Sequence, residues 1–145
     1  MSVVQISLIL TCFNEGPTFE KSVRQVVSVL EKTKKKREIV FVDDKSTDET
    51  KKTIEKLVGQ IKNSKAIYHS KNQGRGKSVA DGIRASRGKI CGYLDVDLEV
   101  SPDYIPLFVR EIEDDADMAI GRRFYEGGIK SIVRYFSIEN LCTSS

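Results

Sequence analysis

Short apolar runs of strand length alternate with segments of helical periodicity along most of this chain. We expect strands at residues 6–10, 39–42, 66–68, 90–94 and 118–120. Between them, apolar residues recur at the spacing of one helix face, as at Val23, Val26, Val27 and Leu30. This order predicts an α/β fold, with a mainly parallel sheet of about five strands flanked by helices. A length of 145 residues suits one such domain.

Polar and charged residues gather where these expected strands end. In a parallel sheet with helices on both faces, ligands bind beyond the carboxyl ends of the strands. The sequence places four groups there: Asn14 with Glu15, Asp43 with Asp44, a glycine-rich stretch at residues 72–77, and Asp95 with Asp97. Their coincidence at one edge predicts a ligand site.

The sharpest local signal is the pair formed by Asp95 and Asp97, which follows an apolar run. Side chains alternate across a strand, so we expect both carboxylates to leave on the same side. Such a pair repels unless a positive group lies between its members, and a hard divalent cation fits that role best. The pair therefore predicts a cation site of the kind that holds a diphosphate.

Three further patterns are weak when taken alone. Asp43 and Asp44 can cap the following helix, or one of them can accept a hydrogen bond from a nucleobase. The glycine-rich stretch is not a complete phosphate loop, because Lys71 stands where its first glycine would be, yet a cationic loop before a helix suits anions. Arg123, after the last expected strand, can meet a phosphate in the same crevice or pair with a nearby carboxylate.

Composition excludes several classes of protein. The net charge of +3 is too small to argue for nucleic-acid binding, and the cationic run at residues 32–37 is typical of a solvated helix end. Three cysteines without metal-type spacing argue against a disulfide framework, so we expect Cys12 and Cys91 to be buried in a protein of a reducing, cytoplasmic compartment. No apolar run reaches the ~20 residues of a membrane span, and the first one is too short for a signal peptide.

Residues 127–145 fit the alternating pattern less well. Apolar residues from Ile129 to Leu141 are interrupted by Lys130, Ser131 and Arg134. This amphipathic tail is compatible with a core helix, an interfacial helix at the cytoplasmic face of a membrane, or a surface that pairs with another chain. The candidates for such docking are Ile132, Tyr135 and Phe136.

Taken in order, several short stretches of the chain resemble the nucleotide-sugar domain of family 2 glycosyltransferases, which have the GT-A fold. The match is closest to the branch resembling dolichol-phosphate mannose synthase and polyprenyl-phosphate glucosyltransferases. It covers about residues 5 to 136, through the stretches at residues 11–15, 42–50, 72–77, 95–98 and 120–124. The resemblance assigns residues 1–126 to this domain and implies that the tail begins the acceptor-side segment.

The resemblance implies roles for individual residues. The nucleotide-sugar pocket would be lined by Thr11, Phe13, Glu15, Val42, Asp44, Lys77, Asp95 and Val96, with Val42 and Asp44 at the base and Val96 near the ribose. Asp95 and Asp97 would hold Mg²⁺ or Mn²⁺ against the diphosphate. Arg123 would face the diphosphate or an acceptor phosphate, and Arg134 matches a second family arginine less closely.

Two departures from the family pattern bear on function. Thr11 and Phe13 replace the usual proline and tyrosine, and Phe13 keeps the ring but lacks the hydroxyl that could bind a base. Members of this branch also continue well beyond 145 residues, so the chain is expected to have an incomplete acceptor half, as part of a longer protein, a truncated gene product or a subunit that a partner completes.

The implied activity is metal-dependent transfer of a hexose, with inversion, from a nucleoside diphosphate sugar of the GDP-mannose or UDP-glucose type to a polyprenyl or dolichyl phosphate. The alternative is a nucleotide-sugar binding module without turnover. A receiver-type signalling domain fits less well, because it needs a lone aspartate after the third strand, where this chain has Tyr68, His69 and Ser70.

Overall fold

The computed structural model of the chain describes residues 3–124 and 128–135. They belong to two compact units that divide between Pro102 and Asp103. The division falls inside the stretch that the sequence assigns to one nucleotide-sugar domain, and that assignment of residues 1–126 stays a prediction.

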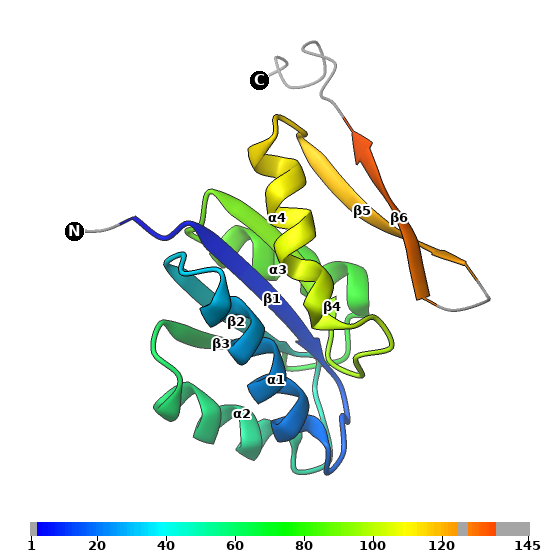
Figure 1. The fold of residues 1–145 in the computed structure, drawn as a ribbon. Helices are drawn as coiled ribbons and strands as arrows, with labels where there is room; N and C mark the ends of the chain where they lie inside the picture. The colour runs from blue at the N-terminus through cyan, green and yellow to red at the C-terminus, as the bar shows by residue number, and fades with distance from the viewer. Residues whose placement is uncertain (1–2, 125–127, 136–145) are drawn as a thin grey trace, which may run out of the picture. The chain divides into compact units, whose positions relative to one another are not determined.

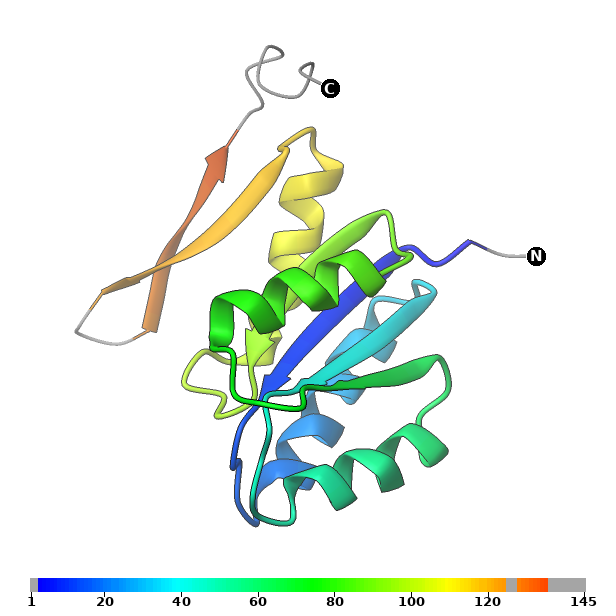
Figure 2. The same ribbon diagram turned by 180° about the vertical axis from the view of Figure 1, so that it is seen from behind.

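The first unit is built on a parallel sheet with the strand order β3-β2-β1-β4. The strands are β1 (Ile6–Cys12), β2 (Arg37–Asp43), β3 (Ser64–Tyr68) and β4 (Ile90–Asp95), and the helices are α1 (Phe19–Lys32), α2 (Thr50–Gln60) and α3 (Arg75–Ala85). Helices α1 and α2 cover one face of the sheet and α3 covers the other (Figures 1 and 2). The predicted α/β class and mainly parallel sheet are confirmed, with four strands in place of about five.

The two central strands carry the core of this unit. β1 and β2 have almost no exposed side chains, because helices cover both faces of the sheet. From one face α1 adds Phe19, whose ring meets that of Phe41 edge to face at a centroid distance of 6.4 Å. Full burial of one such side chain stabilises the fold by about 1.5–3 kcal/mol.

A buried carboxylate stabilises the edge of the sheet at which the parallel strands begin, the amino edge. Glu38 is 1% exposed, and it accepts a hydrogen bond from Ser7 Oγ at 2.6 Å and others from the backbone and Nε of Arg87. Burial raises the pKa of Glu38, but the hydrogen bonds from Ser7 and Arg87 outweigh it, so the net pKa is lowered. The carboxylate thereby fixes the connection from α3 into β4.

Gly88 lies in this connection. Helices commonly end at a glycine, but α3 ends at Ala85 with Ser86 as its C-cap, so Gly88 does not cap it. Gly88 instead donates its N–H to Ser7 Oγ at 2.7 Å, and a Cβ at this position would lie 2.5 Å from the backbone nitrogen of Ser7. The close approach of two backbones is what requires glycine here.

The second unit contains α4 (Ile105–Glu113), β5 (Met118–Phe124) and β6 (Gly128–Tyr135). β5 and β6 form an antiparallel pair with an irregularity between Arg122 and Arg123. The expected fifth strand therefore exists but pairs with β6, not with the parallel sheet. The helical alternatives for residues 128–135 are wrong, because β-branched Ile129, Ile132 and Val133 favour a strand and β5 supplies its partner.

The cysteines divide between buried and exposed positions. Cys12 is buried, as expected, whereas Cys91 is exposed, so the expectation for Cys91 was wrong. β4 has only one hydrogen-bonded neighbour among the described strands, and its alternate residues Cys91 and Tyr93 both face outward. Position in an apolar run did not distinguish this edge strand from a central one.

We expect Gly88→Ala to lower the free energy of unfolding by about 1–3 kcal/mol, because the new methyl group meets rigid backbone. The matched control is Gly59→Ala in α2, where a Cβ would meet nothing within 4 Å and better helix propensity adds up to about 1 kcal/mol of stability. Urea denaturation of the 145-residue chain measures both. Equal midpoints for the two variants would contradict this account of Gly88.

Candidate functional site

A cleft of about 400 Å³ opens at the carboxyl edge of the parallel sheet. Its walls come from the ends of β1, β2 and β4 and from the glycine-rich loop before α3. The lining residues are Thr11, Cys12, Phe13, Glu15, Asp44, Asn72, Gly74, Arg75, Ser78, Asp95, Val96 and Asp97. The predicted edge of the sheet is therefore where these residues meet.

Asp95 and Asp97 both line this cleft, but not for the reason that the sequence suggested. β4 ends at Asp95, and the chain then turns: Leu98 N–H donates to the Asp95 carbonyl at 3.3 Å, and Glu99 N–H donates to Asp97 Oδ1 at 3.1 Å. Leu98 has a φ of +54°. The two carboxylates converge because of this turn, and strand alternation plays no part beyond Asp95.

The end of β1 and the residues directly after it also line the cleft. Thr11 Oγ1 lies 3.5 Å from Asp95 Oδ1, and Phe13 is 49% exposed. Glu15 accepts a hydrogen bond from Phe13 N–H at 3.1 Å. Burial raises the pKa of Glu15, the hydrogen bond lowers it, and the negative charges of Asp97 and Asp95 raise it, so the net pKa is raised. The three carboxylates thus lie close enough for Asp95 and Asp97 to disfavour the charge on Glu15.

The loops after β1 and β2 hold each other in place. Asn14, which has a φ of +48°, accepts a hydrogen bond from Thr47 N–H at 2.8 Å and donates its own N–H to Ser46 Oγ at 2.9 Å. Asp43 in turn accepts a hydrogen bond from Ser46 Oγ at 2.6 Å. Asp43 and Asn14 therefore position the loops rather than face the cleft.

Asp44 organises the glycine-rich loop. Its carboxylate accepts hydrogen bonds from Gln73 N–H and Gly74 N–H, each at 2.8 Å, and it lies 2.8 Å from His69 Nδ1. Burial raises the pKa of Asp44, but these hydrogen bonds outweigh it and the net pKa is lowered. The carboxylate is 8% exposed at one side of the cleft, so any contact with a base would use its remaining lone pair.

The structure does not bring every predicted residue to the cleft. Val42 is fully buried in a cluster with Ile9 and Val40, and Lys77 forms an ion pair with Asp81 at 2.5 Å on α3. Neither lines the cleft. Arg123 lies in β5, in the second unit, and its side chain is outside the described part of the structure, as are the side chains of the tail.

Two charged or titratable residues at the site were not predicted individually, although the glycine-rich stretch at residues 72–77 was. Arg75 lines the cleft, and its guanidinium lies 3.4 Å from Asp95 Oδ2. His69, the sole histidine of the chain, lies behind the cleft wall against Asp44. Their signal in the sequence was position: His69 directly follows β3, and Arg75 begins α3, so both stand at the carboxyl edge.

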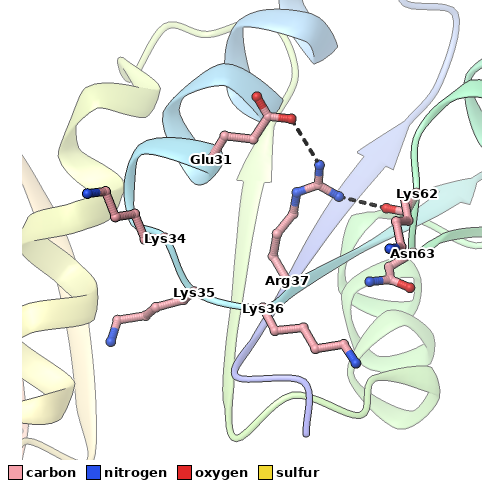
Figure 3. Close-up of a pocket in the computed structure, with 7 residues that line it drawn as sticks. All are labelled: Glu31, Lys34, Lys35, Lys36, Arg37, Lys62 and Asn63. Carbon is pink, nitrogen blue, oxygen red and sulfur yellow. Dashed lines mark hydrogen bonds and ion pairs between the residues drawn. The ribbon is translucent and has the colours of Figure 1, made fainter. Parts of the chain in front are cut away.

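A second pocket lies at the amino edge of the sheet and has a different character. It has a volume of about 550 Å³ and is lined by Glu31, Lys34, Lys35, Lys36, Arg37, Lys62 and Asn63 (Figure 3). Arg37 is held there by Glu31 at 3.3 Å and by the Lys62 carbonyl at 2.7 Å. Cations at the end of α1 complement the helix dipole, so this pocket has a structural explanation.

The chemistry of the cleft suits a divalent cation bound together with an anionic ligand. Among residues 3–124 and 128–135, no three His, Cys, Asp or Glu side chains are arranged to hold a metal unaided. Asp95 and Asp97 supply two carboxylates at the cleft, and Asp95 already attracts the cationic Arg75. Oxygen atoms of a bound ligand would complete the coordination of a hard cation.

Within the same described ranges, no helix has both the length and the apolar character needed to cross a bilayer.

Residues 7–137 match the family model described as Glycosyl transferase family 2. The chain belongs to this family. It is 30% identical over 125 residues to a dolichol-phosphate mannosyltransferase of Pyrococcus furiosus, covering 86% of this chain and 35% of that protein. It is also 30% identical over 122 residues to a dodecaprenyl-phosphate galacturonate synthase of Rhizobium johnstonii, covering 83% of this chain and 36% of the relative. The chain thus spans little more than a third of these relatives.

Solved structures agree on the GT-A fold. The mannosyltransferase PcManGT from Pyrobaculum calidifontis, in complex with GDP-Man and Mn²⁺, has a TM-score of 0.64 at 20% identity over 83% of this chain and 35% of that one. TarS residues 1–349 of S. aureus, in complex with UDP-GlcNAc, has a TM-score of 0.61 at 23% identity over 88% of this chain and 37% of that one. At these identities the likeness concerns the fold.

We expect Asp44→Asn to destabilise the chain by about 2 kcal/mol at pH 7, because buried N–H groups lose a charged acceptor. The folded-state pKa of Asp44 is lowered, so its stabilisation is present above the ordinary aspartate range and is lost as the pH falls through the folded-state value. The stability gap between the unmodified chain and the variant should therefore shrink from about pH 5 downward. Urea midpoints across this range test it, with exposed Glu55→Gln as control.

Proposed function

We propose that this domain binds a nucleoside diphosphate sugar in the cleft at the carboxyl edge and transfers its hexose, with inversion, to a polyprenyl phosphate. The observation that carries the proposal is the convergence of Asp95, Asp97 and Glu15 with an exposed aromatic ring in one cleft of a family 2 domain. Relatives named for dolichol-phosphate and dodecaprenyl-phosphate substrates support the class of acceptor.

In this proposal the nucleotide lies between the β1 and β2 ends. Phe13 offers an apolar face to the base or ribose, and Asp44 offers its remaining lone pair to a base N–H. The backbone of Val96, whose side chain is buried, lies between the two aspartates and would contact the ribose. Either GDP or UDP fits this description, because both bases have an N–H that can donate.

Asp95 and Asp97 would hold Mg²⁺ or Mn²⁺ at the diphosphate, as their position in the cleft allows. A divalent cation there neutralises the charge that develops on the departing diphosphate. Support comes from a fold neighbour whose structure contains GDP-Man and Mn²⁺. Arg123 remains a candidate for contact with the diphosphate or the acceptor phosphate.

A phosphate acceptor simplifies what the protein must supply. It is already anionic near neutral pH, so no side chain has to remove a proton from the attacking oxygen. A sugar hydroxyl would need a general base in addition to the carboxylates that hold the cation. The phosphate is therefore the acceptor that asks least of the described cleft.

We expect GDP or UDP to bind the chain in the presence of Mn²⁺ and to lose most of this affinity with EDTA, because Asp95 and Asp97 alone repel a diphosphate. Isothermal titration calorimetry of both nucleotides measures this. The Asp95→Ala/Asp97→Ala variant should bind at least about tenfold more weakly, and the matched control Asp115→Asn, outside the cleft, should bind normally. Metal-independent binding that survives the double variant would overturn the proposed site.

Sugar transfer is a separate expectation. With the conjugate of the nucleotide that binds, a short polyprenyl phosphate should yield a glycosylated lipid phosphate with inverted anomeric configuration, detectable by mass spectrometry and NMR. Replacing the lipid phosphate by the corresponding alcohol should abolish transfer. Binding without any transfer would identify a nucleotide-sugar binding module and would contradict the enzymatic part of the proposal.

A further inference from the structure

The only histidine of the chain is held between two carboxylates. His69 Nδ1 lies 2.8 Å from Asp44 Oδ1, and its Nε2 lies 2.9 Å from Asp81 Oδ2. The His69 side chain is 5% exposed, and its backbone N–H donates to the Asp43 carbonyl at 2.9 Å, which fixes its position at the end of β3. Three elements of the first unit, β2, β3 and α3, therefore meet at this ring.

Both carboxylates have partners that favour their ionised forms. Asp44 accepts hydrogen bonds from Gln73 N–H and Gly74 N–H, and Asp81 is paired with Lys77 Nζ and with Arg84 at 3.0 Å. An ionised carboxylate can only accept hydrogen bonds, so each ring nitrogen that bonds to one must carry a proton. Short contacts at both nitrogens therefore require the imidazolium form of His69.

One of the two carboxylates that contact His69, Asp44, is part of the wall of the cleft. Asp44, which the ring contacts, also binds the two backbone N–H groups of the glycine-rich loop and lines the cleft itself. The next residue along the loop is Arg75, which begins α3 and reaches Asp95. The orientation of this loop, and with it the reach of Arg75, depends on where Asp44 is held.

We propose that His69 is a positioning residue, a charged bridge between Asp44 and Asp81 that holds the glycine-rich loop in the conformation that binds the donor. Removing the imidazole would leave the Asp44 carboxylate without one of the contacts that hold it against Gln73 N–H and Gly74 N–H, so donor affinity should fall in His69→Gln. The charged groups that face the ring are Asp44 after β2 and Asp81 on α3, and Lys77 and Arg84 bear on it through Asp81. The link to donor binding rests on the proposed function, whereas the charged bridge does not.

The first test needs no ligand. In the ¹⁵N-labelled chain the single histidine gives one set of ring signals, and both ring nitrogens should show the signature of N–H groups. Hydrogen exchange of the Gln73 and Gly74 amides, compared at equal pH, should be roughly tenfold faster in His69→Gln than in the unmodified chain. A neutral ring, or unchanged exchange in His69→Gln, would overturn the bridge.

Two further variants separate the bridge from a general loss of packing. In Asp81→Asn, Nε2 can accept a hydrogen bond from the amide, so a neutral ring still donates to Asp44. The loop amides should then stay protected, unlike those of His69→Gln. Arg84→Gln is the matched control, because it removes another partner of Asp81 and leaves both His69 bonds in place. A loss of loop protection in Arg84→Gln equal to that in His69→Gln would contradict the proposal.

The donor-binding consequence is measured by calorimetry with Mn²⁺ and the nucleotide that binds. Affinity should be about tenfold lower in His69→Gln than in the unmodified chain, whereas Asp81→Asn should keep most of it. Equal affinity in His69→Gln and the unmodified chain would overturn the link between bridge and donor. No binding by the unmodified chain at any pH would count against the proposed function, while the ring and exchange measurements would still decide the bridge.

Discussion

The register of the parallel sheet is the constraint on which the site depends. β1 pairs with β2 on one side and with β4 on the other, so that Thr11 lies opposite both Val42 and Asp95, and Cys12 lies opposite Asp43. Residues up to 84 positions apart in the chain therefore reach the same level at one edge. A slip of one residue in either pairing would turn the side chains of that strand to the other face and separate the walls of the cleft.

Bringing so many carboxylates to one edge has an electrostatic cost, and the structure meets it in three ways. Asp43 and Asp44 are satisfied by hydroxyl and backbone donors of the loops that they organise. Asp81 and Asp44 share the imidazole of His69, and Asp95 faces Arg75. Glu15, Asp95 and Asp97 retain mutual repulsion, which a cation and its diphosphate would relieve. The remaining negative potential is thus consistent with the proposed ligand.

At the amino edge of the sheet, a buried carboxylate is also satisfied by nearby donors, and there it stabilises the fold. Glu38 is buried there with Ser7 and Arg87 as partners, and Gly88 allows the close approach of two backbones. The two edges differ in what their buried carboxylates do. Glu38 has its partners within the fold, whereas the Asp95 side chain is 37% exposed in the cleft. The difference follows from strand direction, because ligands of parallel sheets bind beyond the carboxyl ends of the strands.

Much of the fold could be predicted from the sequence because it follows from local patterns. Apolar runs predicted the central strands, helical spacing predicted α1 and α2, and the order of elements predicted a parallel sheet. The edge of the site followed from that order alone. The pairing partners of the strands were harder to predict. Met118–Ile120 is apolar enough for a strand, but nothing local shows that β6 is its neighbour. Cys91 was expected to be buried because a sequence does not show which strand lies at an edge.

Within the site, the sequence by itself determined which chemistry is present: paired aspartates, an aromatic ring and a glycine-rich loop, each at a strand end. Only the tertiary structure decided how these groups are used. It buries Val42, directs Lys77 to Asp81, turns the chain after Asp95 and places His69 between two carboxylates. The reason is physical, since local sequence sets conformation and polarity, whereas the partner of a charged side chain depends on which distant segments pack beside it.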